Sequence, residues 1–127
     1  MRPTSGLVVG ILVLALAGCA SSGAAGGGAD DQLRLGAKAA ERGYWQEALF
    51  RFQRADQARP NSAEILNNVA VALEALGRYD EALSTYKKAL EVAPKNTVIR
   101  RNYARFAEFF TSYARGVKPK GGAGESR

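Results

Sequence analysis

The spacing of apolar residues in residues 63–96 predicts two consecutive α-helices. In each segment the apolar positions recur three or four residues apart, as they do along one face of a helix. The first segment contributes Ile65, Leu66, Val69, Ala70, Leu73 and Leu76, and the second contributes Tyr79, Ala82, Leu83, Tyr86, Ala89 and Leu90. Gly77 separates the two segments, and Pro94 follows the second. Because both residue types end helices, this stretch is predicted to form a helix hairpin.

Residues 29–62 repeat this pattern at an offset of 34 positions. Matched pairs occur without a gap at Gly43 and Gly77, Glu47 and Glu81, Ala48 and Ala82, Leu49 and Leu83, Phe52 and Tyr86, Ala55 and Ala89, and Pro60 and Pro94. Small residues such as Ala48 and Ala82 allow helices to approach closely, and Gly43 and Gly77 suit the left-handed end of a helix. The internal repeat therefore predicts a second hairpin that packs on the first.

Residues 97–115 begin as a third copy, but only one helix is predicted there. Its apolar stripe consists of Ile99, Tyr103, Phe106, Ala107 and Phe110. Gly116 stands where this helix is expected to stop, and residues 116–127 have the composition of a disordered basic tail. The predicted fold class is all-α, with two helix hairpins and a C-terminal closing helix. Because stable arrays usually need about three repeats, association with itself or with a partner is expected.

These repeats resemble the tetratricopeptide repeat (TPR), in which a bulky residue, Leu-Gly and an aromatic precede Ala, an aromatic and Pro. The second copy supplies Leu66, Val69, Ala70, Leu73, Ala82, Tyr86, Ala89 and Pro94, and the first supplies Leu35, Gly36, Ala48, Phe52, Ala55 and Pro60. Gln32 and Ala39 stand where bulky residues are usual, so the first helix is expected to be weaker, as in a terminal repeat that faces solvent. The resemblance implies a TPR-type α-solenoid. Its domain spans residues 30–115, with repeats at 29–62 and 63–96 and the closing helix at 97–115.

The resemblance also implies a binding groove. In TPR proteins the first helix of each pair lines a concave surface that holds an extended peptide or a partner helix. The matching positions here are Leu33, Ala37 and Ala40 in the first copy, Asn67, Val71 and Glu74 in the second, and Arg101, Arg105, Glu108 and Phe109 on the closing helix. This groove is expected to change from apolar to polar to basic along its length. Leu33 and Ala37 replace the Lys and Asn of the carboxylate clamp found in chaperone-binding members, so that specificity is not implied.

The chain begins with the layout of a secretory signal peptide at residues 1–18. Arg2 precedes an uninterrupted apolar or small run at residues 7–17, which small residues follow. Such a run is too short to cross a bilayer, which needs about 20 apolar residues. The alternatives, a short membrane anchor or a buried helix, are disfavoured by the glycine- and serine-rich tract at residues 21–28.

Residues 16–19, Leu-Ala-Gly-Cys, resemble the lipobox of bacterial lipoproteins. The resemblance implies that the Cys19 thiol receives a diacylglyceryl group, that cleavage occurs just before it, and that the new amino terminus is acylated. Ala20 in place of Asp resembles lipoproteins sent to the outer membrane, so the expected location is its periplasmic face. Residues 19–29 are then a lipidated, flexible tether. Cys19 is the only cysteine, which excludes intrachain disulfides and cysteine-based metal sites.

Positive charge is concentrated in the closing helix and the tail. Residues 95–127 contain eight basic and two acidic side chains, a net charge of +6, whereas residues 19–94 contain nine basic and ten acidic side chains, a net charge of −1. A basic patch can attract nucleic acid, anionic lipid or an acidic protein surface. Export to the cell envelope argues against nucleic acid, and no nucleic-acid-binding motif is present. The alternative interpretation is a solvated face that keeps the domain soluble.

The sequence lacks the residue patterns of common catalytic sites. It has no histidine, no second cysteine, no G-x-S-x-G motif and no phosphate-binding glycine loop. Glu41, Glu74 and Asp80 fall at exposed helix positions and are interpreted as ordinary surface charge. We therefore expect no enzyme activity, no catalytic residue, no metal site and no cofactor.

Two functions are compatible with these features. The first is a lipid-anchored scaffold of the bacterial envelope that binds an unidentified protein or peptide of a secretion, pilus or outer-membrane assembly system. The second is a small structural lipoprotein that forms a homodimer through its closing helix. Phe109 and Tyr113 lie beside the main apolar stripe of that helix, where they either broaden its buried face or form a contact patch.

Overall fold

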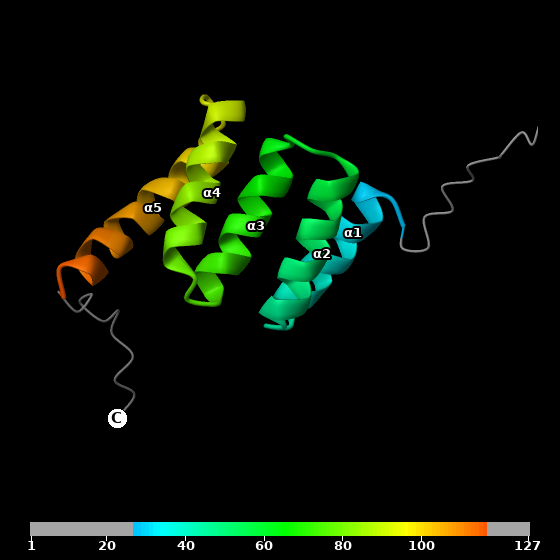
Figure 1. The fold of residues 1–127 in the computed structure, drawn as a ribbon, viewed down its shortest axis with the longest axis horizontal. Coiled ribbons are helices and arrows are strands. Elements are labelled where there is room, and N and C mark those ends of the chain that lie inside the picture. Colours follow the sequence, from blue (N-terminus) through cyan, green and yellow to red (C-terminus); the bar gives the residue numbers. More distant parts are fainter. Residues whose placement is uncertain (1–26, 117–127) are drawn as a thin grey trace, which may run out of the picture.

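The computed structural model describes residues 27–116, and the predicted signal peptide, Cys19 and the basic tail after Gly116 lie outside this part of the chain. The described residues form five helices, α1 (Ala29–Glu41), α2 (Trp45–Ala58), α3 (Ala63–Ala75), α4 (Tyr79–Val92) and α5 (Thr97–Ala114) (Figure 1). This part of the chain has no strand, which confirms the all-α prediction. Ala29, predicted to close the tether, is instead the first residue of α1. None of these helices is both long and apolar enough to cross a membrane.

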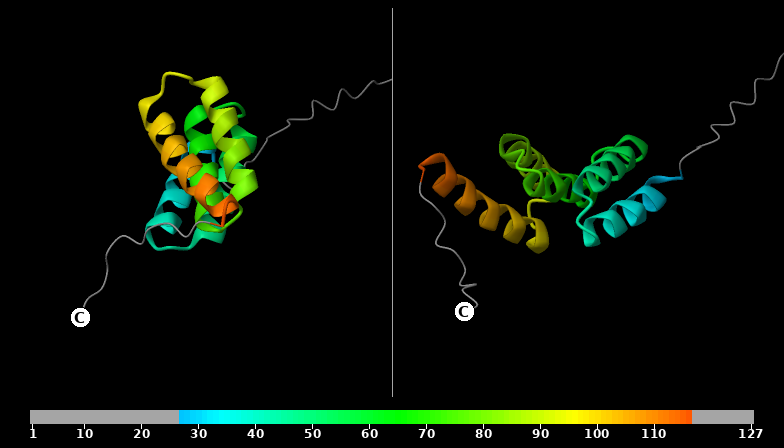
Figure 2. Two further views of the ribbon diagram at one scale, coloured as in Figure 1. Left: turned by 90° about the vertical axis from the view of Figure 1, so that its left-hand side faces the viewer. Right: turned by 90° about the horizontal axis from the view of Figure 1, so that it is seen from below.

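The helices pack as antiparallel neighbours in the order of the chain. Contacts join α1 to α2, α2 to α3, α3 to α4 and α4 to α5, and α3 also touches α5. As a result, α1, α3 and α5 lie on one side of the array, and α2 and α4 lie on the other (Figure 2). The first helices of the two hairpins and the closing helix therefore share one face.

Side-chain caps and glycines define where the helices begin and end. The Ser62 hydroxyl accepts a hydrogen bond from the Ile65 amide, and the Asn96 side chain accepts one from the Ile99 amide at 3.1 Å, so both satisfy free amides in a first helical turn. Gly77 has a φ of 74°, and the next amide, that of Arg78, donates to the Leu73 carbonyl at 2.9 Å. This bond pattern ends a helix on a left-handed residue. It confirms the predicted stop after α3.

The core confirms the predicted division into small and large side chains. The small members, all completely buried, are Ala48, Ala55, Ala70, Ala82 and Ala89. Tyr86, Phe106 and Ile65 are the largest of the fully buried side chains in the described domain, together with Ile99 and Gln32. Alanines let the helix axes approach, and the large side chains fill the volume beside them.

In α1, contrary to the prediction, the two residues that depart from the repeat pattern do not lie on a solvent-facing side. Gln32 and Ala39 are buried rather than on a solvent-facing side, because α1 packs closely against α2. The Gln32 side-chain oxygen accepts a hydrogen bond from Arg51 of α2 at 3.4 Å. At Gly36 the Phe52 ring of α2 lies so close that an added Cβ would stand 2.5 Å from a ring carbon. The departures from the repeat pattern therefore belong to the α1–α2 interface.

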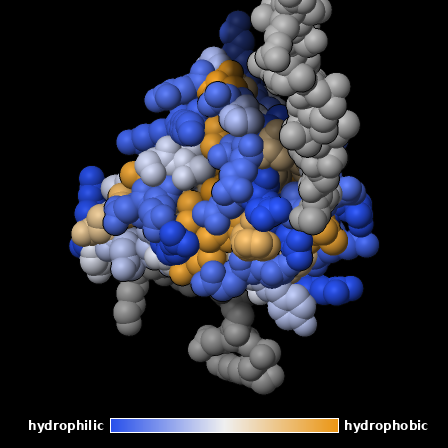
Figure 3. Space-filling view, turned by 45° about the vertical axis from the view of Figure 1, so that its right-hand side comes forward, coloured by the Kyte–Doolittle hydropathy of each residue, from blue (hydrophilic) through white to orange (hydrophobic). Residues whose placement is uncertain are grey.

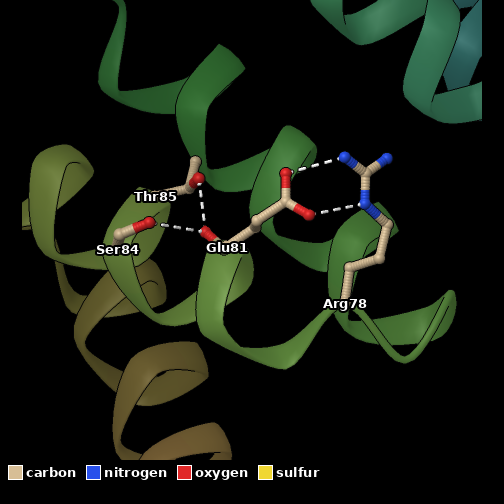
Figure 4. A network of polar contacts seen from close by, with 4 residues as sticks. All are labelled: Arg78, Glu81, Ser84 and Thr85. Carbon is tan, nitrogen blue, oxygen red and sulfur yellow. Dashed lines mark hydrogen bonds and ion pairs between the residues drawn. The ribbon is translucent and has the colours of Figure 1, made fainter.

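An exposed ion pair marks the start of α4. Two guanidinium nitrogens of Arg78 donate hydrogen bonds to the Glu81 carboxylate (Figure 4). Arg78 Nε lies 2.8 Å from Glu81 Oε1, and Arg78 Nη2 lies 2.7 Å from Glu81 Oε2. This pair holds the pKa of the Glu81 carboxyl below its ordinary value. The Ser84 and Thr85 hydroxyls donate to the Glu81 main-chain oxygen at 3.0 and 2.7 Å. Because the pair is open to solvent, its contribution to folding is small.

Candidate binding groove

Two adjoining hollows lie on the face formed by α1, α3 and α5. The hollow between α1 and α3 is lined by Ala37, Ala40, Glu41, Trp45, Phe52, Asn68 and Val71. The hollow between α3 and α5 has a volume of about 320 Å³ and is lined by Trp45, Val71, Glu74, Ala75, Tyr79, Arg105 and Phe109. Trp45 and Val71 line both hollows, so the two form one groove, which we call the concave groove.

Six of the predicted binding residues line the concave groove, and the other four lie outside it. Val71, Glu74, Arg105 and Phe109 line the same hollow. Ala37 and Ala40 line the adjoining one. Arg101 and Glu108 are exposed on α5 but do not line the concave groove, and Arg101 lines a separate hollow between α4 and α5. Leu33 packs against the core with part of its surface exposed.

Asn67 lies inside a helix interface rather than on an open surface. Asn67 is 8% exposed. Its side-chain Oδ1 accepts a hydrogen bond from the side-chain Nδ2 of Asn102 in α5 at 3.2 Å. The bond links α3 to α5 directly. Asn67 therefore positions the closing helix and offers little surface to a partner.

Glu74 is not the ordinary surface charge that its position in the sequence indicated. Its side chain is 25% exposed, and one carboxylate oxygen accepts a hydrogen bond from the buried Tyr86 hydroxyl at 2.9 Å. Arg105 Nη2 lies 3.3 Å from both carboxylate oxygens. Three helices thus meet at one carboxylate, because α3 carries Glu74, α4 carries Tyr86 and α5 carries Arg105. The interpretation as plain surface charge was wrong because the packing of α4 and α5 encloses this position.

Burial raises the pKa of the Tyr86 hydroxyl well above its ordinary value of 10.0, and the negative charge of Glu74 raises it further. Ionisation of Tyr86 is therefore easier in the unfolded chain than in the folded domain. The stability that comes from keeping this phenol neutral is complete below pH 10 and falls as the pH rises toward the folded pKa.

We expect Tyr86→Phe to remove this alkaline dependence. Above pH 10 the free energy of unfolding of the native chain should fall by up to about 1.4 kcal/mol per pH unit through this residue alone. The variant should lack that part of the slope and should lose about 1 kcal/mol at neutral pH, because Glu74 loses a hydrogen-bond donor. Urea denaturation at pH 7, 10 and 11 measures both effects. Tyr44→Phe, at an exposed tyrosine, is the control. Equal alkaline slopes in all three proteins would contradict the assignment.

An aromatic cluster closes one end of the concave groove. The Tyr79 ring centroid lies 5.1 Å from that of Phe109 and 5.0 Å from that of Tyr113, both in edge-to-face geometry. Phe109 and Tyr113 stack on each other at 6.1 Å. Both side chains therefore extend the packed surface between α4 and α5. Their role as a contact patch stays a prediction.

Trp45 and Tyr79 are groove residues that were not predicted from the sequence. Each is the first residue of the second helix in its hairpin, and from there its ring reaches the groove lined by the first helices. A signal for them exists in the sequence, because positions 45 and 79 differ by the repeat offset and both are aromatic.

The other end of the domain has a different surface. Figure 3 shows the side of α1 and α2 with hydrophilic side chains over most of it and apolar side chains in narrow strips. Phe50 of α2 is exposed, and the Arg51 and Arg54 guanidinium carbons lie 5.5 and 6.0 Å from its ring centroid. These arginines cover part of the ring.

Comparison with known proteins agrees with this geometry. Residues 63–96 match the sequence profile of the tetratricopeptide repeat. The crystal structure of the Sgt2 TPR domain from Aspergillus fumigatus is similar to this chain, with a TM-score of 0.53 and 16% sequence identity over 78% of this chain and 89% of that chain. No curated protein matches the chain. The described domain is therefore an all-α solenoid of the TPR type, a fold of protein-interaction scaffolds, and residues 63–96 are a tetratricopeptide repeat.

Proposed function

We propose that this chain is a membrane-anchored scaffold of the bacterial cell envelope that binds a peptide or a partner helix in its concave groove. The observation that carries the proposal is the hollow between α3 and α5, where Trp45, Val71 and Phe109 adjoin the Glu74–Arg105 pair. Apolar and aromatic lining with a few polar groups is the usual composition of a binding site. A secretion, pilus or outer-membrane assembly system is the proposed setting.

The charge at this hollow favours a partner that combines an apolar anchor with an acidic residue. The Arg105 side chain is 64% exposed, and its 3.3 Å contacts with Glu74 are long for charged partners. Arg101 lies one helical turn before it on α5 and is also exposed. A partner carboxylate can therefore reach Arg105 without displacing Glu74 from Tyr86. The apolar side chain of the partner would occupy the space beside Val71 and Phe109.

Reversing charge at the basic side of the groove should weaken partner capture. We expect Arg105→Glu to reduce recovery of a specific crosslinked partner from membranes at least tenfold, a change of about 1.4 kcal/mol. Arg54→Glu changes the net charge equally at an exposed position outside the groove and is the control. Thermal melting of both variants verifies that they fold. Undiminished recovery with the groove variant would count against this binding site.

Membrane attachment is a separate part of the proposal and rests on Cys19 within its lipobox-like segment. We expect Cys19→Ala to accumulate as unprocessed precursor, because alanine has no thiol to accept the lipid. Ser21→Ala lies two residues further on and should be processed normally. Immunoblotting of membrane and soluble fractions, together with metabolic labelling by a palmitate analogue, measures the outcome. Normal cleavage with label retained in Cys19→Ala would exclude lipidation at this residue.

A further inference from the structure

A third hollow lies outside the concave groove, between the end of α4 and the first half of α5. It is the largest of the three, about 620 Å³, and its lining consists of Leu90, Pro94, Thr97, Arg100, Arg101, Tyr103 and Ala104. We call it the end hollow. In the two hairpins, the corresponding side of the first helix packs against the second helix of the same hairpin, and on α3 the position equivalent to Arg101, Asn67, is also covered by α5. After α5 the described chain contains no such helix.

Comparison of equivalent positions in the repeats indicates which kind of structure can fill the end hollow. Gly36, Ala70 and Ala104 are successive positions at the offset of 34 residues. Gly36 lies directly under the Phe52 ring of α2, and Ala70 is completely buried. Ala104 is exposed. The third member of this series therefore keeps the small side chain that permits close helix packing, but no helix in the described domain covers it.

The residues that follow α5 do not have the sequence of the missing helix. In the two hairpins the second helix presents Ala48 and Ala82, then an aromatic, then another alanine. The equivalent positions after α5 are Gly116, Lys120 and Ala123. A lysine thus stands where Phe52 and Tyr86 fill the core of their hairpins. The occupant of the end hollow is therefore sought in another chain.

The charge of the end hollow favours an acidic occupant over a second copy of this chain. Arg100 and Arg101 line it, no carboxylate does, and neither arginine forms an ion pair within residues 27–116. Residues 95–127 have a net charge of +6, so two copies meeting at this end would repel each other. An acidic helix would instead be attracted.

We propose that the end hollow receives an amphipathic helix of a partner protein, with a small apolar face against Ala104 and acidic residues beside Arg100 and Arg101. This helix takes the place of the second helix of an incomplete third repeat. It would also cover apolar surface of Tyr103 and Leu90 that the described domain leaves accessible.

The test uses the purified full chain and a fluorescent peptide with the sequence of α4, because α4 is the helix that covers α3 in the complete repeat. The peptide has Lys87→Glu and Lys88→Glu to supply an acidic flank. We expect saturable binding by fluorescence anisotropy, weaker in high salt, and no binding of a scrambled peptide of the same composition. Ala104→Leu should weaken binding at least tenfold, because its larger side chain fills the hollow. Ala114→Leu, the same change at an exposed position further along α5, should bind as the native chain does.

Two further variants separate the end hollow from the concave groove. Arg100→Glu should weaken peptide binding, whereas Arg105→Glu, in the groove, should leave it unchanged. Binding that is absent, that survives Ala104→Leu, or that Arg105→Glu abolishes would overturn the proposal. Light scattering tests whether a second copy of the chain occupies the end hollow instead. A dimer of the full chain that Ala104→Leu dissociates would show this and would also overturn the proposal.

Discussion

Phe106→Ala is expected to lower the free energy of unfolding by about 3–5 kcal/mol. Phe106 is completely buried, and its ring centroid lies between 5.6 and 6.3 Å from those of Tyr79, Tyr86, Phe109 and Phe110. Truncation removes the central ring of this cluster and leaves a cavity between α4 and α5. Since α5 touches little of the domain besides α4, we expect it to detach first. Urea denaturation followed by circular dichroism and by tyrosine fluorescence measures the loss.

The matched control is Phe50→Ala, which removes the same side chain at an exposed position of α2. Its contacts with Arg51 and Arg54 are solvent-exposed cation–π contacts, worth about 0.5–1 kcal/mol. The control should therefore lose less than about 1 kcal/mol. Similar losses for the two variants would show that the aromatic cluster does not hold α5 in place.

Gly36→Ala is expected to destabilise the domain by about 1–2 kcal/mol, although alanine is the better helix former. Alanine favours a helix over glycine by about 1 kcal/mol. Here, however, the added Cβ would stand 2.5 and 2.6 Å from two carbons of the buried Phe52 ring. Relieving such a contact means moving α1 away from α2, and overpacking of this kind costs about 1–3 kcal/mol or more.

A double-mutant cycle tests whether the Phe52 ring is the cause. Phe52→Leu makes room beside position 36, so the combined variant should lose at least about 0.5 kcal/mol less than the sum of the single changes. Gly28→Ala, where an added Cβ meets nothing within 4 Å, should lose no more than about 1 kcal/mol, the cost of alanine at the N-cap of α1, and should show no coupling to Phe52→Leu. Additive losses at positions 36 and 52 would contradict the contact.

Local patterns were enough to predict the helices and their ends. The spacing of apolar residues, together with the glycines at positions 43 and 77, predicted where both hairpins lie. Helix periodicity and left-handed helix ends depend on residues only a few positions apart, so the sequence shows them directly. The offset of 34 residues then predicted the stacking, since each hairpin must bury its apolar stripe on a neighbour. The predicted closing helix at 97–115 agrees with α5 to one residue.

The candidate groove was predicted in part. Repeat positions placed Val71, Glu74, Arg105 and Phe109 on one face, and the structure gathers them around one hollow. The contacts and the exposure of each side chain could not be predicted from these positions. Glu74 is held by Tyr86 and Arg105, and Asn67 is covered by α5, because contacts 12 to 35 residues apart decide which side chains stay open.

The sequence alone was sufficient to establish five helices, their order and the small residues at their interfaces, because all of these follow from short-range spacing and an internal repeat. Only the tertiary structure established that Glu74 joins three helices, that Trp45 and Tyr79 reach into the groove, and that Ala104 lies uncovered at the end of the array. These features depend on how far each helix is rotated about its axis and on which neighbour covers it. Packing between helices decides both.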